Sequence, residues 1–146
     1  MIEELINASD LFLLVIAHPD DESMFFFPTI YNLVQTTSTS IPFRVLCLSN
    51  GSFDGAGRER EKELAKAALF LGLDSRAVRI LNDECLQDDP NTDWDTAVVR
   101  NCVGMHIKSL AKQHSPFKNM RAIRVTVITF DERGISGHRN HISVFK

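Results

Sequence analysis

The sequence has no excess of basic residues that would attract a polyanion. It contains 16 Lys and Arg residues against 19 Asp and Glu, which gives a formal net charge of -3. Proteins that bind nucleic acid usually carry a basic patch or an overall positive charge. The overall electrostatics therefore give no support to nucleic-acid binding, and we expect the partner to be a small molecule or a lipid headgroup.

The sequence also lacks paired cysteines. Cys47, Cys85 and Cys102 are odd in number and widely spaced, and none belongs to a C-x-x-C pair. This pattern predicts neither a disulfide framework nor a thiolate zinc site. We expect three reduced, mostly buried thiols in a reducing compartment.

Long apolar runs are absent as well. The longest early run covers residues 11–17, is too short to span a bilayer, and follows no basic stretch of the kind that begins a signal peptide. We expect no transmembrane segment in this chain. With 146 residues, 44% hydrophobic and 24% charged, the composition is typical of a globular protein, and we expect a single domain over residues 1–146.

Strand patterns alternate along the chain with helix patterns. Apolar runs predict strands at residues 11–17, 43–48, 77–81 and 123–130. The segments between them predict helices at residues 22–35, where Pro28 starts or kinks the helix, at residues 58–71 with Gly72 at the end, and from an N-cap at Thr92, with Trp94, Val98, Cys102 and His106 on one face. This order predicts an α/β fold with a parallel sheet and right-handed crossovers.

Each predicted strand is followed by polar residues: 18–22, 49–51, 82–84 and those from Asp131 onward. Parallel sheets bind ligands in the crevice beyond the carboxyl ends of their strands. The segment Ala-His-Pro-Asp-Asp-Glu (17–22) puts an imidazole and three carboxylates there. A hydrolytic zinc site needs three protein ligands and an open position for water, so His18 with Asp20 or Asp21 would supply two ligands.

A second histidine-bearing segment, residues 131–141, follows the last predicted strand. Its His138 and His141 are spaced so that both can face one way on a single helical turn. Taken alone, an H-x-x-H pair is weak evidence because surface histidines are common, and an acidic run can be a solvated helix N-terminus. The two segments together, each after its own strand, predict a shared metal site.

The H-P-D-D-E and G-x-S-G-H-x-N-H segments resemble those of the PIG-L/LmbE-like de-N-acetylases, and within them the eukaryotic N-acetylglucosaminyl-phosphatidylinositol de-N-acetylases. The resemblance runs through most of residues 11–144. It implies a Rossmann-like, three-layer LmbE-like fold with a mostly parallel sheet. Family members usually continue beyond the H-x-x-H segment, so the domain is expected to be short at its C-terminal end.

The resemblance also implies roles for five residues. His18, Asp21 and His141 would bind Zn2+ or another divalent metal, Asp20 would be the general base that activates water, and His138 would stabilise or protonate the tetrahedral intermediate. The chemistry is consistent with general principles, since zinc acidifies water and polarises a carbonyl while a free carboxylate accepts the proton.

Two further residues would contact the substrate. Arg60 resembles an arginine that holds a phosphate or a sugar hydroxyl, although an ordinary solvated charge on a helix explains it equally well. Asp88 resembles an acidic residue that contacts the sugar. There the chain departs from the family pattern, which more often has aspartate at the position of Cys85 and glycine at that of Asp89.

The implied function is zinc-dependent hydrolysis of N-acetylglucosaminyl-phosphatidylinositol to glucosaminyl-phosphatidylinositol and acetate, in GPI-anchor biosynthesis. The implied location is the cytoplasmic side of the endoplasmic reticulum membrane, with peripheral membrane contact, although relatives commonly have an N-terminal anchor that we do not find here. Two alternatives stay open: a de-N-acetylase of soluble N-acetylglucosamine conjugates, and a truncated, non-catalytic form that binds metal or sugar.

Overall fold

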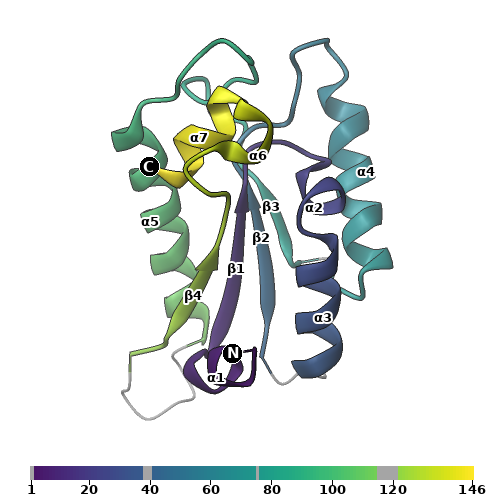
Figure 1. Ribbon diagram of the computed structural model, residues 1–146, viewed down its shortest axis with the longest axis vertical. Helices are drawn as coiled ribbons and strands as arrows, with labels where there is room; N and C mark the ends of the chain where they lie inside the picture. Colours follow the sequence, from purple (N-terminus) through teal and green to yellow (C-terminus); the bar gives the residue numbers. More distant parts are fainter. Residues whose placement is uncertain (1, 38–40, 75, 115–121) are drawn as a thin grey trace.

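The computed structural model describes residues 2–37, 41–74, 76–114 and 122–146, and it has the predicted α/β architecture (Figure 1). Four strands form one sheet in the order β3-β2-β1-β4, and the three strand pairs are parallel. The elements are α1 (Ile2–Ala8), β1 (Leu11–Ile16), α2 (Asp21–Met24), α3 (Phe27–Thr37), β2 (Phe43–Cys47), α4 (Gly57–Phe70), β3 (Val78–Ile80), α5 (Thr96–His114), β4 (Val125–Ile128), α6 (Gly134–Gly137) and α7 (Arg139–Phe145).

The central strands are continuously apolar because both faces of the sheet are covered. Every residue of β1 is buried, and four of the five residues of β2 are buried, whereas β3 and β4 at the edges are only partly buried. The helices form two layers, with α3 and α4 on one side of the sheet and α5 on the other (Figure 1). The predicted three-layer fold is confirmed.

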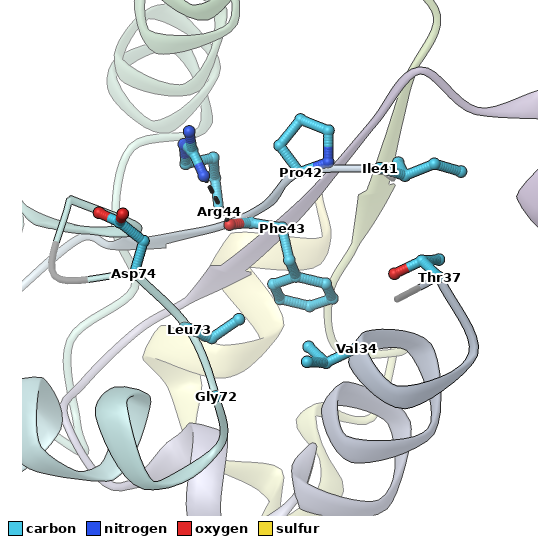
Figure 2. A pocket seen from close by; sticks show the side chains of 9 residues that line it. All are labelled: Val34, Thr37, Ile41, Pro42, Phe43, Arg44, Gly72, Leu73 and Asp74. Atoms are coloured by element: carbon cyan, nitrogen blue, oxygen red, sulfur yellow. Dashed lines mark hydrogen bonds between the residues drawn. The ribbon is translucent and has the colours of Figure 1, made fainter. Parts of the chain in front are cut away.

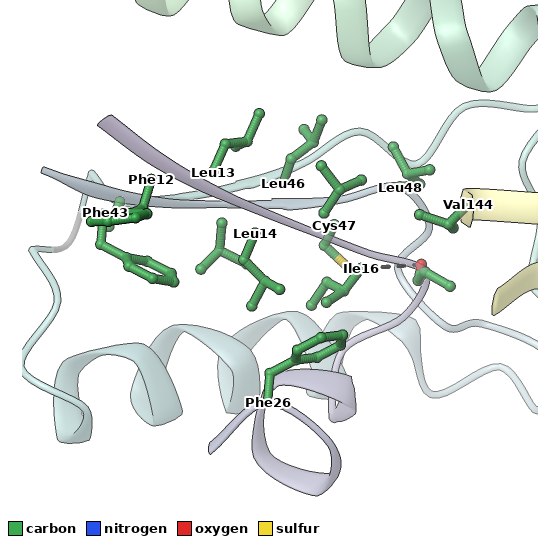
Figure 3. Packing of buried hydrophobic residues seen from close by; sticks show 14 of the residues in the cluster. Phe12, Leu13, Leu14, Ile16, Phe26, Phe43, Leu46, Cys47, Leu48 and Val144 are labelled. Atoms are coloured by element: carbon green, nitrogen blue, oxygen red, sulfur yellow. Dashed lines mark hydrogen bonds between the residues drawn. The ribbon is translucent and has the colours of Figure 1, made fainter. Parts of the chain in front are cut away.

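Alternate residues of the central strands fill the two halves of the core (Figure 3). Leu13 and Leu46 point toward the layer of α5, whereas Leu14 and Ile16 point toward Phe26 on the other side. This alternation follows from the two-residue period of a strand, and it leaves no solvated face in the middle of the sheet. The core thereby fixes the position at which each central strand ends, which is where the polar segments begin.

Local signals placed two helix boundaries correctly. The expected helix over residues 22–35 is divided into α2 and α3, and Pro28 is the second residue of α3, where a missing N–H costs little. Gly72, with a φ of 81°, follows the C-cap Leu71 of α4. A positive φ at this place is the usual way to end a helix.

The predicted start of the third helix is wrong, and helix α1 was not predicted. The Thr92 hydroxyl donates to Asp89 Oδ2 at 2.7 Å within a turn, so Thr92 caps no helix. The helix α5 begins four residues later, after Asp95, whose Oδ1 accepts the N–H of Ala97 at 2.7 Å. Trp94 therefore lies before α5 and not on its face, and its indole N–H donates to the Gln87 carbonyl.

A cavity of about 280 Å³ lies at the amino end of β2, opposite to the end from which the polar segments emerge (Figure 2). The ring of Phe43 points toward Val34 of α3, and the guanidinium of Arg44 lies on the other side of the strand. Among the described helices, none combines the length and apolar composition that crossing a bilayer requires.

Candidate active site

The His-Pro-Asp-Asp segment emerges from the carboxyl end of the buried strand β1. His18 and Asp21 are 4% and 1% exposed. Asp21 Oδ2 accepts the backbone N–H groups of Ala17 at 3.0 Å and His18 at 2.9 Å. The turn that leads into α2 therefore fixes the Asp21 carboxylate through Oδ2, and Asp21 Oδ1 lies beside His141.

Asp20 holds the turn in an unusual backbone conformation. Its φ is 110°, a value that costs a residue with a side chain roughly 1–3 kcal/mol. The backbone N–H of Asp20 donates to Glu22 Oε2 at 3.0 Å, and Glu22 is itself buried. Strain of this kind persists where surrounding contacts enforce it. In this conformation the Asp20 side chain is 52% exposed, whereas the neighbouring Asp21 is buried.

The second segment folds back over the same end of the sheet, as the position of α6 and α7 beside β1 indicates (Figure 1). Gly134 has a φ of 58°, and a Cβ there would lie 2.9 Å from the Cβ of His141. Only glycine permits this approach, which lets the Gly134 carbonyl meet His141 Nδ1 at 3.1 Å. The imidazole of His141 also stacks on Phe130, with ring centroids 4.2 Å apart.

His138 is the N-cap of α7, and its Nδ1 accepts the N–H of Asn140 at 3.2 Å. This hydrogen bond occupies Nδ1, so Nε2 is the ring nitrogen that remains for chemistry. The His138 ring centroid lies 4.8 Å from that of His18 and 4.7 Å from that of His141.

The two predicted segments do converge. Asp21 Oδ1 lies 3.1 Å from His141 Nε2, and Asp21 Oδ2 lies 4.0 Å from His18 Nδ1. The donor nitrogens of His18, His138 and His141 all lie within 4.8 Å of one another. A metal ion could therefore be held by His18 and His141 together with Asp21, as the family resemblance implies, or with His138 as the third ligand, which the pairing of the two segments in the sequence had left open.

The chemistry of this donor set fits zinc, because two imidazole nitrogens and one carboxylate are a common ligand set of hydrolytic zinc sites. Each of the three predicted ligands also has its outer atom held. His141 Nδ1 meets the Gly134 carbonyl, His18 Nε2 lies 3.0 Å from Asn140 Oδ1, and Asp21 Oδ2 accepts two backbone N–H groups. Such outer contacts select the tautomer of a ligating histidine and aim its other nitrogen at the metal.

The site is also electrostatically coupled. Burial lowers the pKa of His18, but the hydrogen bond to Asp88 and the charges of Asp21 and Asp88 outweigh it, so that the pKa is raised. Burial, followed by the charges of His18 and His141, lowers the pKa of His138. Burial raises the pKa of Asp20, although Arg60 opposes this shift. A raised pKa makes Asp20 a better proton acceptor than an ordinary surface aspartate.

Arg60, in α4, connects three loops of the site. Its Nη2 donates to Asp20 Oδ2 at 2.9 Å and to the Pro19 carbonyl at 2.8 Å. Its Nη1 donates to the Gly51 carbonyl at 2.7 Å and to Asp88 Oδ2 at 3.3 Å. The interpretation of Arg60 as an ordinary solvated charge is therefore wrong, because the side chain is only 23% exposed and fully engaged.

Asp88 lies beside the candidate ligands. Its Oδ1 is 3.1 Å from His18 Nε2, and its side chain is 9% exposed. Burial raises the pKa of Asp88, but the hydrogen bond and charge of His18, together with the charge of Arg60, outweigh it and lower the pKa. The carboxylate is thus held ionised between His18 and Arg60. A small cavity of about 130 Å³ is lined by Asp20, Arg60 and neighbouring residues of α2 and α4, and Asp88 does not line it.

Comparison with known proteins shows the family of this chain. The family model described as "PIG-L: GlcNAc-PI de-N-acetylase" matches residues 13–146. The chain belongs to the PIG-L family.

PIG-L relatives carry a common name. The chain is 44% identical over 139 residues to a probable N-acetylglucosaminyl-phosphatidylinositol de-N-acetylase of Schizosaccharomyces pombe, covering 95% of this chain and 50% of the relative. It is 36% identical over 132 residues to the N-acetylglucosaminyl-phosphatidylinositol de-N-acetylase of Bos taurus, covering 90% of this chain and 46% of the relative. The chain thus spans about half the length of the curated relatives it matches.

Solved structures show the same fold at lower sequence identity. An N,N'-diacetylchitobiose deacetylase of Pyrococcus horikoshii matches with a TM-score of 0.68 and 18% identity, over 99% of this chain and 49% of that one. A conserved protein of Thermus thermophilus matches with a TM-score of 0.60 and 23% identity, over 93% of this chain and 52% of that one. At these identities the likeness concerns the PIG-L fold alone.

One central residue of this PIG-L chain was missed by the sequence reasoning. Asn140 is 0% exposed, and its side chain contacts His18, the Asp89 N–H and the Thr92 carbonyl. The available signal was its place between the two histidines of the G-x-S-G-H-x-N-H segment. Its partners come from distant loops, so its role becomes visible only in the fold.

Proposed function

We propose that this chain is a metal-dependent de-N-acetylase that hydrolyses N-acetylglucosaminyl-phosphatidylinositol to glucosaminyl-phosphatidylinositol and acetate. The observation that carries the proposal is the convergence of His18, Asp21 and His141, with Asp20 and His138 beside them. Family membership supports the reaction type, and the names of the relatives support this substrate and a role in GPI-anchor biosynthesis.

We assign the metal, zinc by preference, to His18, Asp21 and His141. When bound, zinc lowers the pKa of water to about 7 and polarises the amide carbonyl as a Lewis acid. Asp21 is preferred to His138 as the third ligand because its carboxylate is buried and already fixed by two backbone N–H groups. His138, at the N-terminus of α7, is then free to act on the substrate.

Asp20 is the proposed general base. Arg60 occupies Asp20 Oδ2, which orients the carboxylate and leaves Oδ1 to take a proton from the attacking water. The water oxygen then bonds to the acetyl carbon, and the C–N bond breaks. His138 Nδ1 accepts the Asn140 N–H, so the neutral ring carries its hydrogen on Nε2 and can donate a hydrogen bond to the oxygen of the tetrahedral intermediate. The proton that Asp20 takes from the water passes to the departing amine.

Arg60 and Asp88 are the proposed substrate-side residues, and of these two Arg60 lines the small cavity that it shares with Asp20. Their present contacts also support a positioning role, because Arg60 holds Asp20 and Asp88 holds His18. A phosphatidylinositol-linked substrate would be met at a membrane. We therefore propose peripheral contact with the cytoplasmic face of the endoplasmic reticulum.

Release of acetate tests the proposal. Zinc-loaded protein is incubated with N-acetylglucosaminyl-phosphatidylinositol in detergent or with soluble N,N'-diacetylchitobiose, beside Asp20→Asn and the exposed control Glu59→Gln on α4. We expect turnover of the lipid substrate by the wild type and Glu59→Gln, and a loss of about 100-fold or more in Asp20→Asn. Turnover of the soluble substrate alone would select the alternative substrate class. Zinc binding without any turnover would select a non-catalytic form.

A further inference from the structure

A second polar cavity lies away from the candidate active site. It has a volume of about 380 Å³ and lies between the edge strand β3, the start of β2 and the C-terminal half of α5. Its polar lining comes from Arg44, Arg76, Arg79, His106, Ser109 and Gln113, and none of the described residues that line it is acidic. We call it the basic groove. Figure 1 shows that this half of α5 lies toward the amino ends of the strands, away from α6 and α7.

The positive groups of the basic groove act on one another. Arg44 projects from β2 on the side opposite to Phe43 (Figure 2) and shares the groove with Arg79 and His106. Burial, followed by the charges of Arg79 and Arg44, lowers the pKa of His106. Arg76 is balanced by Asp74, whose Oδ1 lies 3.0 Å from its Nε. Like charges brought together in a partly buried place cost free energy unless an anion is bound.

Two side chains in the groove have nitrogens without a partner in the described part of the chain. The guanidinium of Arg79, an exposed residue of β3, makes no hydrogen bond or ion pair with described residues, although the backbone of Arg79 pairs with β2 and Asp83 lines the adjoining cavity of about 290 Å³. The Nδ1 of His106 is buried and without a hydrogen bond. A buried polar atom without a partner is uncommon in folded proteins and calls for an explanation.

An arginine on an edge strand has a simpler possible role, which is to keep another sheet from pairing with that edge. That role explains Arg79 alone. It does not require Arg44 on the neighbouring strand and His106 on the facing helix to line the same cavity.

We infer that the basic groove is an anion-binding site that takes a phosphate group. The forked guanidinium of Arg79, with that of Arg44, matches the geometry of phosphate oxygens. Ser109 and Gln113 add neutral donors on the same side. The phosphate could belong to a soluble metabolite or to the headgroup of an anionic lipid, since both present the same oxygens. The inference does not rest on the proposed deacetylase activity.

Titration calorimetry with inorganic phosphate, against sodium chloride at matched ionic strength, tests the site. The proteins are the 146-residue chain, Arg79→Gln, Arg44→Gln and the exposed control Arg58→Gln on α4. We expect phosphate to bind the wild type and Arg58→Gln equally, and about tenfold or more weakly to Arg79→Gln and Arg44→Gln, because each loses charge-assisted hydrogen bonds. Equal binding by Arg79→Gln and the wild type, or no binding at all, would overturn the inference.

Sedimentation with vesicles separates the two sources of phosphate. Phosphatidylcholine vesicles with and without phosphatidylinositol are compared for the wild type and Arg79→Gln. Phosphate binding together with Arg79-dependent binding to the anionic vesicles supports a lipid headgroup as the ligand. Phosphate binding without vesicle binding supports a soluble phosphorylated ligand. Vesicle binding that is the same in Arg79→Gln, with no binding of phosphate, contradicts the site.

Discussion

Replacing Asn140 with alanine should damage both stability and metal binding. Asn140 is wholly buried, and its Oδ1 accepts from the Asp89 N–H at 3.1 Å while its Nδ2 donates to the Thr92 carbonyl at 2.8 Å. Removal leaves two polar groups without partners, at about 1–3 kcal/mol each when buried. Because Thr92 is exposed and Asp89 half-buried, water can partly replace the lost bonds. We therefore expect a loss of about 2–4 kcal/mol in the free energy of unfolding.

The same substitution frees His18 Nε2 from its contact with Asn140 Oδ1, 3.0 Å away. That contact favours the tautomer with hydrogen on Nε2 and a lone pair on Nδ1, the nitrogen that faces Asp21. Losing an outer contact of this kind typically weakens metal binding about 10–100-fold. Asp88, which also lies 3.1 Å from His18 Nε2, should keep the effect toward the lower end of that range.

Urea denaturation and competition for zinc with a chelator measure the two effects. The matched control is Asn101→Ala, an exposed asparagine on α5. We expect Asn140→Ala to lower the urea midpoint at constant m-value and to weaken zinc binding, with no change in the control. Zinc affinity equal to that of the wild type, measured under conditions where Asn140→Ala is folded, would refute the account of how His18 is oriented.

Three further predictions concern other parts of the chain. Asp21→Asn should lose zinc measured by atomic absorption, whereas His138→Ala should keep zinc and lose acetate release; the reverse pattern would make His138 the third ligand. Gly134→Ala should destabilise the protein by about 1–3 kcal/mol in urea, because a positive φ and the contact with His141 both oppose a Cβ; an unchanged midpoint would contradict this. Burial, with Arg79 and Arg44, lowers the pKa of His106 below 6.5, so the unfolded chain binds more protons and stability falls as pH drops through that value. His106→Gln should lose less stability than the wild type between about pH 7.5 and about pH 5.5, and an equal loss would count against the pKa shift.

The fold was largely predictable from the sequence because the sheet is covered on both faces. The largely apolar residues 11–16 and 43–47 are buried on both sides only if they form central strands of the sheet. In a parallel sheet, the polar residues that follow them then emerge at the same end, beyond the carboxyl ends of the strands. Helix boundaries depended on local chemistry and were less certain. Thr92 has the residue type of an N-cap, but its hydroxyl donates to Asp89 instead. Sequence alone does not reveal which of several capping residues the tertiary structure will use.

The convergence of the two segments at the candidate site was predictable, and the contacts that support them were not. His18, Asp21 and His141 come from two recognisable segments, and both segments follow parallel strands, so their convergence followed from topology. Asn140 and Arg60 act through loops that are distant in the chain. Their hydrogen bonds depend on where those loops return, which no local pattern encodes.

The zinc content of the purified 146-residue chain beside His141→Ala tests the central claim most directly. A matched control is His114→Ala, a histidine on α5 outside the site. The convergence of the two segments predicts about one zinc per chain in the wild type and in the control, and a loss of zinc in His141→Ala. No zinc in any of the three proteins, or equal zinc in His141→Ala and the wild type, would contradict a metal site built from both segments.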